Sequence, residues 1–198
     1  AIATREVTAE TVVHHHVARI EAVNPKINAV VATRFDEALV EARAVDRAIA
    51  RGESVPPFAG VPCTIKEAFA LTGMPQTSGL VARKNVRSSQ DGTTVARLRA
   101  AGAIPLGVTN VSELCMWMES DNRVYGRTGS AYDPGRTAGG SSGGEGALVG
   151  AGASPFGLGS DVGGSIRMPA FFNGVFGHKP TGGTVPGSVP CACSSWRS

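Results

Sequence analysis

The chain has 198 residues, 42% of them hydrophobic, which indicates one domain with a substantial core and excludes a chain that is disordered throughout. Its net charge is only +3 and its basic residues are scattered, so no nucleic-acid partner is expected. The four cysteines form neither a C-x-x-C pair nor a zinc-ligand spacing, and we interpret Cys63 and Cys115 as free thiols of a cytoplasmic protein. No apolar run approaches the length of a membrane span, and no signal peptide is recognisable.

The N-terminal half is predicted to contain two helices and two further apolar segments. Thr8 is a candidate N-cap of the first helix, and the pair Asn24-Pro25 is expected to end it. In chain order, the elements are a helix over residues 8–23, a β-branched run over 27–33 that fits a strand or a helix start, a helix over 35–51, and a strand within 57–69.

The C-terminal half alternates between helical and strand patterns. Its elements are a helix over 93–103, a buried strand over 103–110, a helical turn or short helix over 112–120, a glycine-tolerant helix over 143–153, a strand within 155–161, and a short helix over 165–172 that stops near Pro169. This alternation favours an α/β fold with a largely parallel sheet flanked by helices.

Several common site motifs are absent from the sequence. The dinucleotide pattern G-x-G-x-x-G fails because Val162 stands at its sixth position, and no P-loop or G-x-S-x-G elbow is present. The run His14–His16 lies on a predicted helix, where consecutive side chains point in different directions, so it is not expected to bind one metal ion. His178 stands alone, and nothing supports a Ser-His-Asp triad built on it.

Residues 137–168 are rich in glycine and serine, as a flexible linker is. They also contain apolar residues such as Leu148, Val149 and Phe156, which a linker does not need. We therefore expect this backbone to pack tightly and to expose N–H groups to a ligand.

Three polar residues stand in apolar or glycine-rich settings. Lys66 ends a candidate buried strand, Ser141 lies in GGSSGG, and Ser165 follows two glycines. Burial disfavours a charged lysine, and a neutral lysine is a general base of the kind that a serine nucleophile needs. Glycine amides before Ser165 offer an oxyanion hole. Taken alone, however, such a lysine is more often a surface residue and such a serine a loop residue, so these residues only suggest a hydrolase.

Several stretches resemble the amidase signature family. GVPCTIKE at 60–67 resembles its lysine motif, and GGSSGGEGA at 139–147 and GSDVGGSIRMPAFFNGVFGHKPT at 159–181 resemble its signature core. The resemblance runs from about residue 5 to about residue 186, includes IEAVNPKINAVV at 20–31, and keeps the family's spacing between the three polar residues. It implies the amidase signature fold, with a mixed, largely parallel sheet that is incomplete at its C-terminal side.

The resemblance also implies roles for individual residues. Ser165 would be the acylated nucleophile, Ser141 the bridging serine held after a cis peptide bond, and Lys66 the base, in an amide hydrolysis that uses no cofactor and no metal. The amides of the oxyanion hole would be those of Val162, Gly163, Gly164 and Ser165. The supporting residues would be Ser142, Asp161 and Arg167.

Within that family, residues 112–120 and 139–150 resemble the fatty-acid amide hydrolases, especially the second type and its bacterial relatives, which implies a fatty-acid or aryl amide as the small-molecule substrate. The following residues would either line an acyl pocket or pack in the core: Cys115, Met116, Trp117 and Met118. The subunit that supplies ammonia for transamidation of glutamyl-tRNA usually has a Ser-Ala run where Glu145 and Gly146 stand, so that alternative is the weaker one.

Family members are much longer than this chain. Residues 1–190 are therefore expected to form the N-terminal part of a single amidase domain, and residues 191–198 to be a tail unrelated to the family, as after a frameshift or a truncated reading frame. Three hypotheses remain: an amidohydrolase, with a homodimer as one possible assembly; an amidotransferase subunit with partner subunits; and an inactive fragment.

Overall fold

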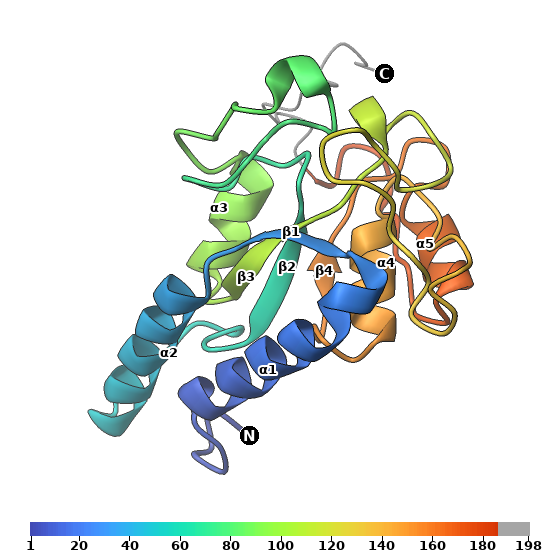
Figure 1. Cartoon of the computed structure of the whole chain (residues 1–198). Coiled ribbons are helices and arrows are strands. Elements are labelled where there is room, and N and C mark those ends of the chain that lie inside the picture. The colour runs from blue at the N-terminus through green and yellow to red at the C-terminus, as the bar shows by residue number, and fades with distance from the viewer. Residues whose placement is uncertain (186–198) are drawn as a thin grey trace.

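The computed structural model describes residues 1–185, which form a central four-stranded sheet with helices on both faces (Figure 1). The helices are α1 (Ala9–Ile27), α2 (Phe35–Ala50), α3 (Thr93–Ala100), α4 (Gly143–Gly150) and α5 (Arg167–Phe172). The strands are β1 (Val30–Thr33), β2 (Pro62–Lys66), β3 (Ile104–Thr109) and β4 (Gly157–Leu158). Two 3-10 turns, Val81–Arg83 and Glu113–Cys115, complete the element order. The tail expected at residues 191–198 lies outside the described residues.

The sheet is mixed and largely parallel, as the sequence predicts. Its strand order is β1-β3-β2-β4, with β2 parallel to both β3 and β4, and β1 antiparallel to β3. In the ladder between β2 and β3, Lys66 pairs with Thr109, and β4 pairs with β2 through Thr64 and Ile65. The carboxyl ends of β2, β3 and β4 therefore meet at one edge of the sheet, where open α/β sheets carry their sites.

Two hydrophobic clusters cover the two faces of the sheet. Leu106 of β3 packs in one cluster with residues of α1, α2 and α4, whereas Ile65 of β2 packs in the other with Val95 of α3. Side chains alternate along a strand, so Thr64 and Lys66 point to the face opposite Ile65. Lys66 is thereby directed toward α4.

Helix α1 continues past Asn24-Pro25, so the prediction that this pair ends the helix is wrong. Pro25 lies in the last turn, and the helix ends only at Ile27. The C-cap is Asn28, whose N–H donates to the Asn24 carbonyl at 2.8 Å. The Asn24 side chain also accepts hydrogen bonds from the amides of Ala29 and Val30. Burial of Ile27 and these caps outweigh the hydrogen bond that proline cannot donate. The predicted N-cap is confirmed, because Thr8 Oγ1 accepts from the Thr11 amide.

Helix α5 likewise runs through Pro169 instead of stopping near it. Arg167 is the first helical residue, so Pro169 is the third. The first amides of a helix have no intrahelical acceptor, and a proline there costs no hydrogen bond. The helix therefore continues to Phe172, the last residue of the predicted segment, and only the expected stop near Pro169 is wrong.

The close packing of helix α4 explains the glycines within this helix, which is part of the glycine-rich residues 137–168. A β-carbon at Gly144 would lie 2.5 Å from the Asn110 amide nitrogen and 2.7 Å from the Ala29 carbonyl oxygen. A β-carbon at Gly146 would lie 2.9 Å from Pro169 of α5. The backbone of α4 thus packs directly on the sheet edge and on α5, and the expectation of tight packing in this stretch is confirmed at this helix.

Candidate active site

Lys66 is fully buried at the carboxyl end of β2, and its side chain reaches two serines. Nζ donates to Ser141 Oγ at 2.7 Å and to Ser160 Oγ at 2.9 Å. These serines come from two different loops, one before α4 and one after β4. The structure therefore brings together Lys66 and Ser141, two of the three residues predicted to form the site.

Ser141 is held at the start of α4 by its backbone. The Gly140–Ser141 peptide bond is cis, as expected. The Ser141 carbonyl accepts a hydrogen bond from Ser120 Oγ at 3.2 Å, and Ser120 Oγ also accepts from the Gly143 amide. A β-carbon at Gly140 would lie 2.7 Å from the Trp117 carbonyl oxygen, so the segment around Trp117 packs against the same peptide. These contacts fix the position of the Ser141 hydroxyl group relative to Lys66.

Ser165 lies in the loop after β4, beside Ser142. The Ser142 amide donates to the Ser165 carbonyl at 3.1 Å, and Ser142 Oγ donates to the Ser160 carbonyl at 3.3 Å. Among the described residues, no hydrogen bond joins Ser165 Oγ to Ser141 Oγ. The structure thus links the Ser165 backbone to the site and leaves the contact between the two hydroxyl groups as a prediction.

Asp161 organises the loop that contains Ser165. Its carboxylate accepts from the amides of Gly164, Ile166 and Arg167 and forms a two-pronged ion pair with the Arg167 guanidinium group at 2.9 and 3.0 Å. Burial raises the pKa of Asp161, but the hydrogen bonds from Arg167 and from these amides outweigh burial and hold that pKa well below its usual range. Asp161 therefore stays ionised and holds both ends of the loop.

The four amides expected to form an oxyanion hole differ in their hydrogen bonding. The Gly164 amide donates to Asp161 Oδ1 at 2.7 Å, so in this arrangement it already has an acceptor. Among the described residues, the amides of Val162, Gly163 and Ser165 make no hydrogen bond to protein. Three of the four predicted donors are thus open to an incoming oxygen atom.

Cys115 to Met118 lie next to this site, and three of their side chains face solvent. Cys115 ends a 3-10 turn and is partly buried, whereas Met116, Trp117 and Met118 are 66%, 65% and 58% exposed. The alternative that these three residues pack in the core is therefore wrong. Ser112 Oγ lies 2.7 Å from the carbonyl oxygens of both Trp117 and Glu119, and its one proton is shared between these two acceptors, which holds the segment.

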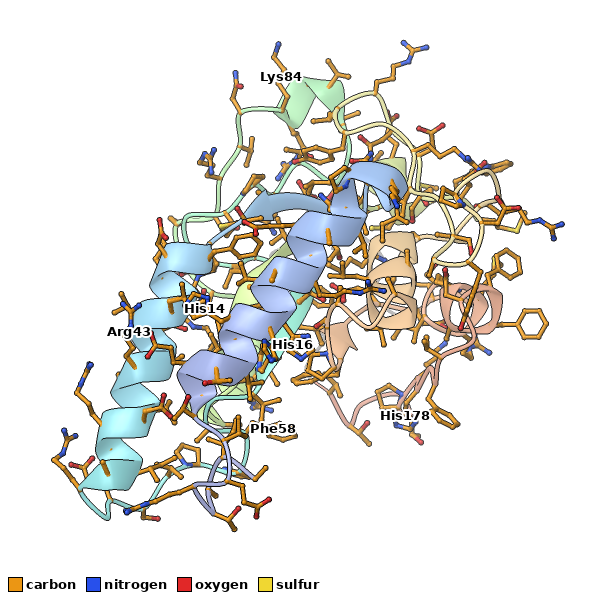
Figure 2. The ribbon with its side chains drawn as sticks, turned by 60° about the horizontal axis from the view of Figure 1, so that its bottom comes forward. His14, His16, Arg43, Phe58, Lys84 and His178 are labelled. Carbon is orange, nitrogen blue, oxygen red and sulfur yellow. The ribbon has the colours of Figure 1, made fainter. Side chains whose placement is uncertain are left out.

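The histidines do not contribute to the site. Figure 2 shows His14 and His16 on α1 and His178 on the segment that follows α5. Among residues 1–185, no three His, Cys, Asp or Glu side chains gather closely enough to hold a metal ion.

Within the same part of the chain, no helix is both long enough and apolar enough to cross a bilayer.

The sequence also matches a family of known proteins. The amidase family matches residues 11–196, which is nearly the whole chain. The chain belongs to the amidase family. The match runs past residue 190, and the domain boundary expected there stays a prediction.

Known relatives of this amidase-family chain share its sequence and its fold. Human fatty-acid amide hydrolase 2 is 54% identical over 96% of this chain and 38% of its own length. A glutamyl-tRNA(Gln) amidotransferase subunit of Acidothermus cellulolyticus is 44% identical over 93% of this chain and 36% of its own length. The crystal structure of a bacterial aryl acylamidase superposes with a TM-score of 0.82 at 36% identity, covering 85% of this chain and 35% of that chain. The chain thus spans well under half the length of these relatives.

Sequence reasoning missed two residues of the site in this amidase fold. Ser160 accepts a hydrogen bond from Lys66, and Glu145 lies buried among β2, β3 and β4. Ser160 directly precedes the predicted loop residue Asp161, and this adjacency was a usable signal. Glu145 is an acidic residue in a run of glycine and apolar residues, a pattern that indicates a buried charge.

Proposed function

We propose that this chain carries the catalytic groups of an amidohydrolase, with Ser165 as nucleophile, Ser141 as bridging serine and Lys66 as general base. The hydrogen bond of 2.7 Å between Lys66 Nζ and Ser141 Oγ is the main support for this proposal. It joins a fully buried lysine to a serine from a distant segment, which an ordinary surface lysine does not do. Membership of the amidase family supports the same reaction class.

In the proposed mechanism, neutral Lys66 takes a proton from Ser141 while Ser141 takes one from Ser165. Ser165 Oγ then forms a bond to the amide carbonyl carbon, and the carbonyl electron pair moves to oxygen. When the oxyanion collapses, the C–N bond breaks and the relay returns a proton to the leaving amine. Water deacylates Ser165 by the same route, which yields a carboxylic acid and restores the enzyme.

The oxyanion would be stabilised by backbone amides of the Asp161 loop. Those of Val162, Gly163 and Ser165 are open, so they can donate without first breaking a protein hydrogen bond. The ionised Asp161 carboxylate keeps these amides in a fixed arrangement, which lowers the cost of organising donors during the reaction.

The proposed substrate is a fatty-acid or aryl amide. Its acyl or aryl group would lie against the exposed apolar side chains of Met116, Trp117 and Met118, which stand on the segment that packs against Gly140. The names of a fatty-acid amide hydrolase and an aryl acylamidase among the relatives favour the same substrate class.

Two alternatives remain. A subunit of a tRNA-dependent amidotransferase is supported by the 44% identity to a protein of that kind, and co-purification of partner subunits would distinguish it. An inactive fragment is supported by the short span of the chain relative to its relatives.

The test is labelling of the purified chain with a fluorophosphonate probe, followed by peptide mapping. We expect labelling at Ser165, its loss in Ser165→Ala, and slowing by about 10²–10⁴-fold in Lys66→Ala, the range of general-base catalysis. Ser154→Ala, which removes another buried serine hydroxyl group, is the matched control and should label at the parent rate. If the chain is folded but is not labelled, the amidohydrolase proposal is wrong and the hypothesis of an inactive fragment remains.

A further inference from the structure

Glu145 is a buried carboxylic acid that the proposed mechanism does not use. It lies in the first turn of α4 and is 6% exposed. Thr64 Oγ1 donates to its Oε2 at 2.6 Å, and Thr109 Oγ1 donates to its Oε1 at 2.7 Å. Each carboxyl oxygen thus has one hydroxyl donor, and the two donors come from neighbouring strands.

These two threonines flank Lys66. Thr64 precedes Lys66 by two residues on β2, so both side chains point to the same face of the sheet. Thr109 is the residue of β3 that pairs with Lys66 in the strand ladder. Glu145 therefore connects the two strand ends that position the lysine.

Strand β4 also packs closely against the carboxyl group of Glu145. A β-carbon at Gly157 of β4 would overlap Glu145 Oε2 and would lie 3.2 Å from Thr64 Oγ1. Only glycine fits there while the carboxyl group is in place. Residues from β2, β3 and β4 thus enclose Glu145, and β4 leads directly into the loop of Ser160 and Ser165.

The electrostatic setting of Glu145 is dominated by its burial. Burial raises the pKa of Glu145 to about 7, although the hydrogen bonds from Thr64 and Thr109 and the charge of Lys66 oppose the increase. On β2, Cys63 is the other titratable group that interacts with Glu145, and burial followed by the Glu145 charge raises the pKa of its thiol, which stays neutral. From β3 and β4, Glu145 contacts Thr109 and Gly157, neither of which titrates.

We propose that Glu145 is a positioning residue for the Lys66 base. Through its hydrogen bonds with Thr64 and Thr109 it holds the strand ends that carry Lys66, and through its own charge it influences the charge of Lys66. This inference rests on the proposed role of Lys66 as a base. An ionised carboxylate favours a nearby ammonium group, whereas a protonated carboxyl group does not.

Two opposite effects on the reaction follow. An ionised Glu145 keeps Lys66 protonated up to a higher pH, which reduces the fraction of neutral base. It also stabilises the ammonium group that forms when Lys66 takes the Ser141 proton, which makes each neutral Lys66 a stronger base. Glu145→Gln should therefore move the acidic limb of the pH profile to lower pH and also lower the plateau.

The experiment measures the rate of fluorophosphonate labelling at Ser165 from about pH 5 to about pH 9, a range that brackets the neutral pH at which general bases are most effective. For Glu145→Gln we expect the acidic limb to move down by about one pH unit and the plateau to fall. A residue with a structural role alone would lower the plateau without moving the limb.

Glu67→Gln is the matched control. Glu67 is also buried and is adjacent to Lys66 in sequence, but its carboxylate accepts hydrogen bonds from the amides of Thr77 and Ser78 and from the Tyr125 hydroxyl group. Adjacent residues of a strand end point to opposite faces, so we expect this variant to keep the parent limb.

Thr64→Val is a second variant, for the case that Glu145→Gln does not fold. It removes a hydrogen bond that favours ionised Glu145, and so should move the limb in the same direction by a smaller amount. If the parent is labelled and a folded Glu145→Gln or Thr64→Val variant keeps the acidic limb of the parent, the proposed role of Glu145 is wrong. A folded parent that is not labelled at any pH would instead remove the proposed function itself.

Discussion

At the scale of single residues, the candidate site depends on two acidic side chains, those of Glu145 and Asp161. Glu145 accepts a hydrogen bond from Thr64 on the strand of Lys66, and Asp161 lies within the loop that contains Ser165. Burial acts on both carboxyl groups, but only Asp161 has an arginine and three amides to compensate for burial. The same kind of group is thus held ionised at one position and titrates near neutral pH at the other.

We expect Asp161→Asn to lower the free energy of unfolding by about 1–2 kcal/mol near neutral pH, a value that allows for the solvent screening of Arg167. The pKa of Asp161 is lower in the folded chain than in the unfolded chain. Its contribution is therefore full above the unfolded value of about 4 and is lost as the pH falls through the folded value. Urea unfolding at about pH 7 and at about pH 3 should show the difference between variant and parent shrinking in acid.

Asp133→Asn provides the comparison for this prediction. Asp133 pairs with Arg136 on the surface, where both side chains are largely exposed, so the change should stay within about 0.5 kcal/mol. Equal stability of Asp161→Asn and Asp133→Asn at neutral pH would contradict the role given to Asp161.

At the scale of elements, α4 determines how closely the loop of Ser141 approaches the sheet. Its glycines at 143, 144 and 146 leave no room for a β-carbon against Ser120, Asn110 and Pro169. A helix with ordinary side chains at these positions would stand farther from β2 and would separate Ser141 from Lys66. The glycines therefore serve close approach and not flexibility.

Gly144→Ala should lower the free energy of unfolding by about 1–3 kcal/mol, the usual cost of overpacking, even though alanine favours helices. The new β-carbon would meet backbone atoms of Asn110 and Ala29, which cannot move without disturbing β3 or β1. Gly182→Ala is the control, because nothing lies within 4 Å of its β-carbon position. Thermal or urea unfolding of the three proteins measures the effect, and a Gly144→Ala variant as stable as the control would refute the close-packing argument.

At the scale of the whole molecule, apolar side chains are exposed near the end of the described chain. Phe171 and Phe172 lie on α5, Phe176 follows it, and Val162 lies in the loop after β4. A hollow of about 300 Å³ between α3 and β4, lined in part by Leu98 and Leu158, contains none of the candidate catalytic residues. Exposed apolar surface of this kind promotes association.

Phe176→Ser should change the free energy of unfolding by less than about 0.5 kcal/mol, because a fully exposed side chain loses no packing. It should also reduce binding of a hydrophobic dye and slow aggregation. Phe69→Ser, in the core cluster of Ile65 and Val95, is the opposite control and should unfold the chain or destabilise it by several kcal/mol, as about 3–5 kcal/mol is usual for loss of a buried phenylalanine. Loss of stability in Phe176→Ser would show that this side chain is packed in solution.

The sequence predicts the order of helices and strands well, because strand and helix patterns are short-range signals. It pairs Lys66 with Ser141, 75 residues apart, through the resemblance of its motifs to a known family. It misplaces the end of α1, because capping by Asn24 outweighs the usual effect of Pro25. It also expects α5 to stop near Pro169, although a proline in the first turn of a helix is tolerated. It does not predict the contacts of Glu145, because the two hydrogen-bond donors to this residue, Thr64 and Thr109, are 81 and 36 positions away in the sequence. Contacts over such separations depend on strand order, which periodicity does not specify.

The meeting of Lys66 with Ser141 and Ser160 spans separations of 75 and 94 residues. No local segment of the chain can reproduce it, and each separation is a loop whose closure costs entropy. Covalent labelling at this site would therefore report on the tertiary structure and would disappear together with it. In a library of variants, probe reactivity would thus separate sequences that assemble the sheet from sequences that merely keep the motifs.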